Sequence, residues 1–503
     1  MKEALKSEEW LRIDPGNFDE DQKELRLGPF DVYWMGFSVI EATWLYKQHI
    51  NADQLRESLR GLIRRLPCLA GRTRRFEPGA NMSFRSMNVG QTKEGGVQFL
   101  QYEMPGSAFD ARDSKALRWS RGLATVPKPS KCLDGTAPLM TVSLTQFLGG
   151  GSALGVAISH GLVDASGFYQ VIHAWSLAHE HGWSDPRVPS MRVERPPCLL
   201  GACGDAEVLD QDNVDFDNNT WNGRAMYSVV MSRLIPSVAG KPRARLSFSA
   251  ADINTMKKHT KCTGGGETTS NEALSARLAL VLGRDILNFY SDEETQFGMI
   301  ASMRRPRIDA ISEDFIGNCA TDLISRRVTS FTDDDLPRVA SIFRDIGDKI
   351  RNRPMEAEQD YLHKQALLRN GVALKSIDPN IQAMTSNFQA RFPMLDVTFG
   401  TQRCIEFLPQ NLGDMIQIVP AGNDGMHVYV QLDWVRGRPN DWLRRVESEL
   451  FRQRVLSVGL PGAGKRKDMP CEMPSPPRTK RSAAGSAFGA GGYAARMFCG
   501  WST

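Results

Sequence analysis

The stretch ISHGLVDASG, residues 158–167, places a histidine and an aspartate four positions apart between glycines. His160 follows a run of small apolar residues and precedes Gly161, a position that can carry an imidazole at the rim of a cleft. The ordinary histidine pKa of about 6.5 suits proton abstraction near neutral pH, so His160 is a candidate general base and Asp164 a candidate partner. A structural histidine, a metal ligand and an ordinary strand end remain open as alternatives.

Other chemistries have weaker support in the sequence. His179 and His181 do not share one helical face, and the zincin motif H-E-x-x-H is absent. No G-x-S-x-G elbow occurs, which argues against a serine hydrolase of that type. GLPGAGKR, residues 459–466, fits G-x-x-x-x-G-K, but Arg466 replaces the magnesium-binding Ser or Thr, and a predicted helix precedes it instead of a strand. Nucleotide binding through Lys465 is therefore a minor alternative.

Hydrophobic periodicity predicts the elements that position His160. Residues 141–147 and 152–159 have strand patterns on either side of a Gly149–Gly151 turn, which predicts a hairpin ending at the histidine. Downstream, apolar residues recur at helical spacing from Phe168 to Trp175, so a helix should follow the motif directly. The candidate base therefore lies between a buried strand and a buried helix.

Helices and strands continue to alternate in the rest of the chain. A helix is predicted over residues 53–66, capped by Asn51 or Asp53, and another after TTSNEALSAR, capped by Ser270 or Asn271. Further predicted elements are strands at 296–303, 316–325 and 426–434 and an amphipathic helix at 441–456. The mixture predicts an α/β fold.

The length and local composition predict two domains and a tail. A chain of 503 residues exceeds the size at which one core usually stops growing. Residues 186–245 are rich in Pro, Asn and Asp, which predicts a crossover loop between an N-terminal half (1–185) and a C-terminal half (246–460). Residues 461–503 are rich in Gly, Ala, Pro and Ser and are expected to be disordered.

Composition excludes several classes of protein. With 41% hydrophobic and 24% charged residues, the chain is typical of a soluble globular protein. No apolar run is long enough for a membrane span, and the charged N-terminal segment does not resemble a secretory signal. The net charge of +4 comes from the tail, so no basic face for nucleic acid is expected. Nine scattered cysteines favour reduced thiols and a cytoplasmic location.

Five landmarks in the expected order resemble the BAHD acyl-CoA-dependent acyltransferases, relatives of chloramphenicol acetyltransferase and of condensation domains. VSLTQFLGGGSALGVAISHGLVDASGFYQVIHAW resembles the HxxxD region of that family. LPCLAGR resembles its P-x-L-A-G-R segment, and TTSNEALSAR resembles its S-T-F-E-A-L-x-A helix start. MRRPRIDAISEDFIGNCA resembles R-x-R…Y-F-G-N, and NFQARFPMLDVTFG resembles the stretch ending in D-F-G-W-G. The likeness covers about residues 27–455.

The resemblance implies two chloramphenicol-acetyltransferase-like domains, each a mixed sheet with flanking helices, and a channel between them. His160 would be the general base that takes a proton from a hydroxyl or amine as that group attacks an acyl-CoA thioester, without a covalent acyl-enzyme. Asp164 would point away from the substrate and pair with an arginine, here Arg304, to fix the loop. Acyl-CoA would be a co-substrate, no other cofactor or metal would be needed, and the protein would act as a monomer on a small-molecule acceptor.

Further residues are carried over by position. Asp396 and Gly400 match the ends of D-F-G-W-G, a mainly structural motif in which Phe399 replaces the tryptophan. That change removes an indole N–H, so an oxyanion donor must come from elsewhere. Ser159 stands where condensation domains carry a second histidine, which favours a free acyl-CoA donor. Three residues would line or shape the CoA side, or simply form a helix cap and a turn: Thr269, Ser270 and Asn318.

A second function fits the same landmarks. A catalytically inactive binding or scaffold protein of this shape would keep Asp164 and Arg304 for folding. In such a protein His160 would be dispensable, which separates the two hypotheses.

Overall fold

A computed structural model shows how these segments fold. It describes residues 4–12, 24–75, 87–113 except 91 and 93, 123–200, 243–260, 266–282, 295–325 except 305–307 and 309, 328, 335–365 with gaps at 353–357, 360 and 363, 382–409 except 401–402, and 415–431. The Lys465 motif, the tail at 461–503 and the helix predicted at 441–456 lie outside these residues.

The first large sheet is mixed and has six strands in the order β1-β6-β7-β8-β3-β13. Strands β6 and β7 pair in parallel, whereas the other neighbours are antiparallel. Its strands are β1 (Ala4–Leu11), β6 (Val97–Met104), β7 (Met140–Phe147), β8 (Ser152–Ser159), β3 (Val39–Tyr46) and β13 (Glu406–Pro409). The predicted hairpin is confirmed as β7 and β8, which places His160 directly after the central strand β8.

Two helices of the N-terminal half contact each other next to this sheet. Helix α2 (Ala52–Arg65) begins where Asn51 accepts hydrogen bonds from the backbone amides of Asp53 and Gln54, which identifies Asn51 as the cap. Helix α6 (Ala165–His181) begins directly after Asp164 and buries the predicted apolar residues, including Phe168 and Trp175. The short helices are α1 (Pro29–Phe37), α3 (Ala108–Asp113), α5 (Pro129–Leu133) and the 3-10 turns η3 (Pro67–Ala70) and η4 (Pro197–Leu200).

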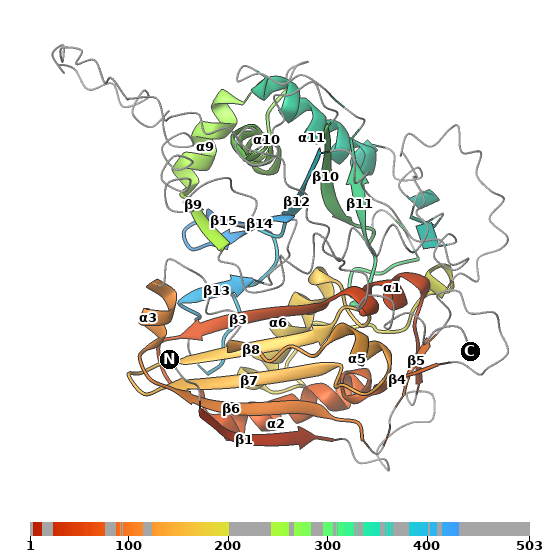
Figure 1. Cartoon of the computed structure of the whole chain (residues 1–503), viewed down its shortest axis with the longest axis vertical. Coiled ribbons are helices and arrows are strands. Elements are labelled where there is room, and N and C mark those ends of the chain that lie inside the picture. Colours follow the sequence, from red (N-terminus) through yellow and green to blue (C-terminus); the bar gives the residue numbers. More distant parts are fainter. Residues whose placement is uncertain are drawn as a thin grey trace, which may run out of the picture. The chain divides into compact units, whose positions relative to one another are not determined.

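The second large sheet, also mixed, has the order β11-β10-β12-β14-β15-β9. Three helices accompany it; α10 contacts both α9 and α11, and α11 contacts β10 (Figure 1). The strands are β11 (Ala320–Ile324), β10 (Thr295–Ser302), β12 (Gln382–Phe388), β14 (Met415–Ala421), β15 (Gly425–Gln431) and β9 (Arg243–Phe248), and the helices are α9 (Ala250–His259), α10 (Ser270–Leu282) and α11 (Leu336–Asn352). A three-stranded sheet joins β2 (Glu24–Arg26), β5 (Met87–Gly90) and β4 (Arg72–Arg75).

The predicted fold class, an α/β fold of two mixed sheets with helices, is confirmed. The predicted residue ranges of the halves stay a prediction, although strand β9 begins at Arg243, two residues before the predicted end of the crossover loop. One strand crosses the predicted division: β13, from the C-terminal half, pairs antiparallel with β3 of the N-terminal half (Figure 1).

Each of the two hydrophobic cores also contains residues from the other half of the chain. Phe399 and Phe407 pack in the core of the first sheet, whereas Phe30 packs in the core of the second and stacks on Tyr361 with ring centroids 5.1 Å apart. None of the described helices has the length and apolar character that a membrane-spanning segment requires.

Candidate active site

His160 sits at the end of β8, between the two halves of the fold. Its backbone amide donates to the carbonyl of Ser38 at 3.3 Å, which ties the residue to the start of β3. Its ring nitrogen Nδ1 lies 2.9 Å from Oδ1 of Asn318, a residue just before β11. The side-chain amide nitrogen of Asn318 donates to the backbone carbonyl of His160 at 2.6 Å. Asn318 therefore holds both the ring and the backbone of His160.

These contacts settle which ring nitrogen of His160 carries the proton. An amide oxygen can only accept, so the bond between Asn318 Oδ1 and His160 Nδ1 requires a hydrogen on Nδ1. The neutral imidazole then has its lone pair on Nε2. This tautomer presents Nε2 as the atom that can take a proton from a substrate.

The protonation state also suits a base. Burial lowers the pKa of His160 below its ordinary value of 6.5, although a backbone hydrogen bond at His160 itself, the Asp164 charge and the Asn318 hydrogen bond partly oppose this effect. The imidazole is therefore neutral at pH 7, which a general base must be before it can accept a proton.

An aromatic side chain stacks on the imidazole of His160. The indole of Trp34, on α1, stacks on the ring of His160 with centroids 4.9 Å apart and an interplanar angle of 14°. The face of an indole attracts a cation, so the same contact stabilises the imidazolium that forms once Nε2 is protonated. Trp34 thereby fixes the plane of the ring without using either of its nitrogens.

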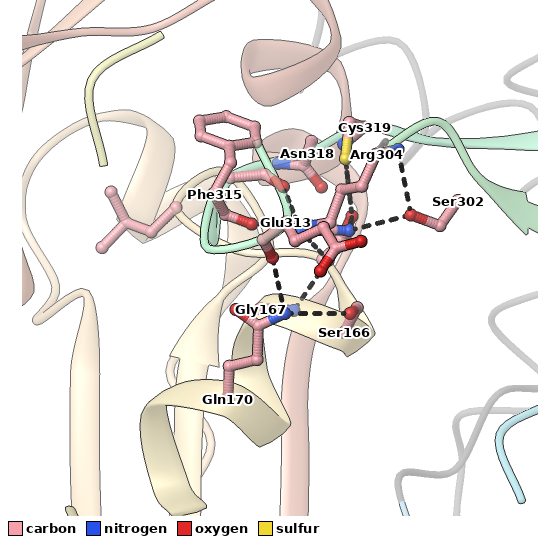
Figure 2. Close-up of polar contacts among 12 residues, drawn as sticks. Ser166, Gly167, Gln170, Ser302, Arg304, Glu313, Phe315, Asn318 and Cys319 are labelled. Carbon is pink, nitrogen blue, oxygen red and sulfur yellow. Dashed lines mark hydrogen bonds and ion pairs between the residues drawn. The ribbon is translucent and has the colours of Figure 1, made fainter. Parts of the chain in front are cut away.

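Asp164 and Arg304 form a buried, bidentate ion pair. Nη1 and Nη2 of Arg304 each lie 2.9 Å from one carboxylate oxygen of Asp164. Figure 2 shows Arg304 next to Ser302, Phe315 and Cys319, and the guanidinium also donates to the Phe315 carbonyl at 2.6 Å. The pairing that the resemblance implied is therefore present in the structure.

Asp164 also starts the helix behind the histidine. Its Oδ1 accepts from the backbone amide of Gly167 at 2.9 Å, and its Oδ2 accepts from that of Cys319 at 3.2 Å. A Cβ on Gly167 would lie 1.8 Å from the carbonyl oxygen of Ile316, so only glycine permits this approach of α6 to the segment before β11. Both carboxylate oxygens are thus occupied by structural contacts, which leaves His160 as the candidate base of the motif.

The D-F-G-W-G-like loop packs on the N-terminal half at a different place. Its backbone accepts hydrogen bonds from β3: Trp44 donates to the Met394 carbonyl at 2.8 Å and Tyr46 to the Val397 carbonyl at 3.2 Å. Phe399 is buried, with its ring edge-on to Trp175 at 4.8 Å. Phe399 therefore fills the core where the family's tryptophan would stand.

The two ends of that loop differ in their surroundings. Gly400 has a φ of 72°, in the left-handed region that favours glycine, which gives its position a conformational reason. Asp396 is exposed, and its amide donates to the Pro393 carbonyl at 3.3 Å. In the described part of the chain neither residue contacts His160, so a supporting role for them stays a prediction.

The residues predicted for the CoA side fall into two groups. Thr269, rather than Ser270 or Asn271, caps α10: its hydroxyl accepts from the amide of Glu272 at 3.2 Å, and the Glu272 carboxylate accepts from the amide of Thr269 at 3.0 Å. Asn318, predicted with them, hydrogen-bonds to His160. A CoA contact remains a prediction for all three residues, and the geometry of Asn318 adds a role at the base.

Sequence reasoning missed a second buried pair close to His160. Asp31, on α1, lies 2.8 Å from Nε of Arg195, a residue of the segment that follows α6. Asp31 is the one acidic residue in the apolar stretch LGPFDVYWMGF, which was the available signal. Among the described residues, no group of three or more His, Cys, Asp or Glu side chains could hold a metal ion.

Comparisons with known proteins agree with this architecture. The chain matches the Transferase family over residues 20–435. It is 24% identical over 331 residues to hydroxycinnamoyl-CoA:piscidic acid hydroxycinnamoyltransferase of Actaea racemosa, an alignment that covers 57% of this chain. The alignment spans 66% of that relative, just under two thirds of its length.

Two solved structures share the fold. The crystal structure of vinorine synthase is similar with a TM-score of 0.61 and 14% identity, over 90% of this chain and 98% of the other. TRI101 of F. sporotrichioides, crystallised with coenzyme A and T-2, is similar with a TM-score of 0.58 and 15% identity, over 84% of this chain and 97% of the other. At these identities the likeness establishes the fold.

Proposed function

Because this chain belongs to the Transferase family, the BAHD acyltransferases, over most of its length, we propose that it moves an acyl group from an acyl-CoA to a hydroxyl or amine of a small molecule. His160 is the general base, and no covalent acyl-enzyme forms. The observation that carries the proposal is the Asn318–His160 bond at 2.9 Å, because it leaves Nε2 unprotonated and available.

The proton has a balanced path in this reaction. Nε2 of His160 takes the proton of the acceptor O–H or N–H while the heteroatom attacks the thioester carbonyl carbon. The tetrahedral adduct then collapses, the C–S bond breaks, and the imidazolium returns the proton to the CoA thiolate. One histidine serves both steps, so catalysis depends mainly on holding two substrates at that ring.

The surroundings of His160 support this assignment. Burial keeps the imidazole neutral at pH 7, and the stacked Trp34 stabilises the transient cation. Asp164 and Arg304 anchor the loop from behind and are proposed as structural support. An acyl-CoA donor is favoured by two relatives, one named for a hydroxycinnamoyl-CoA reaction and one crystallised with coenzyme A.

Release of free CoA tests the proposal. We expect a panel of alcohols and amines, offered with acetyl-CoA, malonyl-CoA and hydroxycinnamoyl-CoA, to include a pair for which the wild-type chain releases CoA. His160→Ala should lower that rate by about 100-fold or more, the usual contribution of a general base.

A matched control uses a histidine elsewhere. His259 is exposed at the end of α9, where its Nδ1 lies 2.8 Å from the Thr255 carbonyl, so His259→Ala should leave the rate unchanged. CoA release that His160→Ala leaves intact would overturn the proposed role of His160, and a panel without any His160-dependent release would favour the inactive scaffold protein.

A further inference from the structure

The second buried ion pair, Asp31 with Arg195, is as closed to solvent as the first. Nε of Arg195 lies 2.8 Å from Oδ2 of Asp31, and the two side chains are 1% and 4% exposed. Nη2 of the same guanidinium lies 3.3 Å from Oδ1. A buried pair of this kind costs desolvation of both charges, so its role depends on the hydrogen bonds that it makes to the groups around it.

Hydrogen-bond directions run from this pair to the imidazole. The Asp31 carboxylate can only accept, and its Oδ1 receives a hydrogen bond from Nδ2 of Asn318 at 2.9 Å. The same Nδ2 donates to the His160 carbonyl at 2.6 Å, so two acceptors face the nitrogen of the Asn318 amide. The amide oxygen must therefore point the other way, toward Nδ1 of His160, and the proton of the imidazole must sit on Nδ1.

Arg195 contacts both Asp31, where these hydrogen bonds start, and the loop that follows His160. It bonds both oxygens of Asp31, through Nε at 2.8 Å and Nη2 at 3.3 Å, which fixes the carboxylate as an acceptor facing Asn318. Its Nη2 also donates to the carbonyls of Gly161 and Leu162, at 3.2 and 2.9 Å, inside the loop between His160 and Asp164. One guanidinium thus holds the backbone of the loop and the acid that orients Asn318.

The loop lies directly against the helix that carries the acid. A Cβ on Gly161 would lie 2.7 Å from Cβ of Met35 and 3.0 Å from the carbonyl oxygen of Asp31, so glycine is what allows this contact with α1. The position of α1 is therefore transmitted to His160 both through the backbone and through Asn318.

We propose that Asp31 and Arg195 are positioning residues that set the tautomer of His160: Arg195 holds the Asp31 carboxylate in place, Asp31 orients the Asn318 amide, and Asn318 keeps the proton on Nδ1. This inference deepens the proposed function, since the tautomer matters for catalysis only if His160 is the base. The Asp164–Arg304 pair has no such link, because the oxygens of Asp164 bind backbone amides and Arg304.

The test reads the tautomer directly. Two-bond proton–nitrogen NMR of protein labelled with ¹⁵N-histidine distinguishes an imidazole protonated on Nδ1 from one protonated on Nε2, with His160 assigned by its absence in His160→Ala. In the wild type we expect the Nδ1–H form alone. In Asp31→Asn, which gives position 31 an amide donor, we expect the Nε2–H form to appear and kcat to fall at least about tenfold with KM little changed.

Two further variants separate this effect from loss of folding. Asp31→Asn leaves Arg195 buried without its counter-charge, so the double variant Asp31→Asn/Arg195→Gln removes both charges and should recover part of the melting temperature without restoring the Nδ1–H form. Asp185→Asn changes an aspartate that pairs with Arg187 at the surface, and should alter neither the tautomer nor kcat.

The outcomes distinguish the two proposals. If His160 stays protonated on Nδ1 in the folded Asp31→Asn and double variants, the positioning role of Asp31 and Arg195 is wrong, whatever the activity. If the tautomer shifts but no CoA release depends on His160, the positioning role stands and the proposed function fails.

Discussion

Two buried arginine–aspartate pairs approach the ring of Phe315, and they serve the same loop in different ways. The guanidinium carbons of Arg195 and Arg304 lie 5.7 and 5.9 Å from the centroid of that ring. Arg304 anchors the end of the loop, at Asp164, where the carboxylate also starts α6. Arg195 anchors its beginning, at Gly161 and Leu162.

The difference shows that similar ion pairs need not have similar roles. The contacts of Asp164 end in backbone amides, so its loss should act through the fold. The contacts of Asp31 continue through Asn318 to a ring nitrogen of His160, so its loss should also act on chemistry. Breaking each pair, and the link between them and the imidazole, tests this contrast.

The largest effect on stability is expected from Asp164→Asn. The amide keeps a helix cap but leaves Arg304 buried without its counter-charge, which typically costs about 3–5 kcal/mol. Denaturant unfolding should show this loss, with turnover falling because the loop shifts. Asp185→Asn, in an exposed pair, is the matched control and should leave the unfolding midpoint unchanged. Unchanged turnover and melting temperature in Asp164→Asn would contradict the anchoring role.

A smaller effect, and a different kind, is expected from Asn318→Ala. Both ion pairs survive, but Nδ1 of His160 loses its side-chain acceptor, so the Nδ1–H tautomer is less favoured and kcat should fall about 10- to 100-fold. Steady-state kinetics checks this. Asn51→Ala, which removes the cap of α2 and about 1 kcal/mol of stability, is the control and should keep full activity. Equal kcat losses in both variants would mean that Asn318 acts only through the fold.

The mildest test uses pH and leaves the chain unchanged. Burial places the pKa of His160 below 6.5, and only the neutral ring accepts a proton. We therefore expect kcat/KM to fall about tenfold per pH unit below the His160 pKa, with the midpoint of this acidic limb below 6.5. An acidic limb with its midpoint above 6.5 would show that His160 is not held neutral by burial. His259→Ala should trace the same limb as the wild type.

Much of the fold was predictable because its signals are local. The strands at 140–147 and 152–159 and the helix after His160 follow from the period of their apolar residues. Strand β13 was not predicted, because it has four residues and its partner β3 lies about 360 positions earlier in the chain. Such a pairing forms only when a segment of the C-terminal half reaches the edge of the first sheet, and no local sequence pattern indicates that.

The candidate site likewise has a part that the sequence predicted and a part that it did not. His160 and Asp164 lie in one motif, and Arg304 could be named because a family pattern links it to that motif. Asp31 and Arg195 are 164 positions apart and carry no motif, so only the folded chain brings them together. Asn318 was named for the CoA side, which stays a prediction, but its bond to His160 was not foreseen, because its position before β11 did not reveal which way its amide points.

Strand β13 has a consequence for how this protein can be divided or recombined. Residues Glu406–Pro409 complete the edge of the first sheet beside β3, and Arg245 of β9 pairs with Glu406 at 2.8 Å. A fragment that stops before Glu406 would expose the edge of β3, a template for intermolecular pairing and aggregation. Chimaeras made by exchanging C-terminal halves between relatives must therefore match this strand to the β3 of their new host.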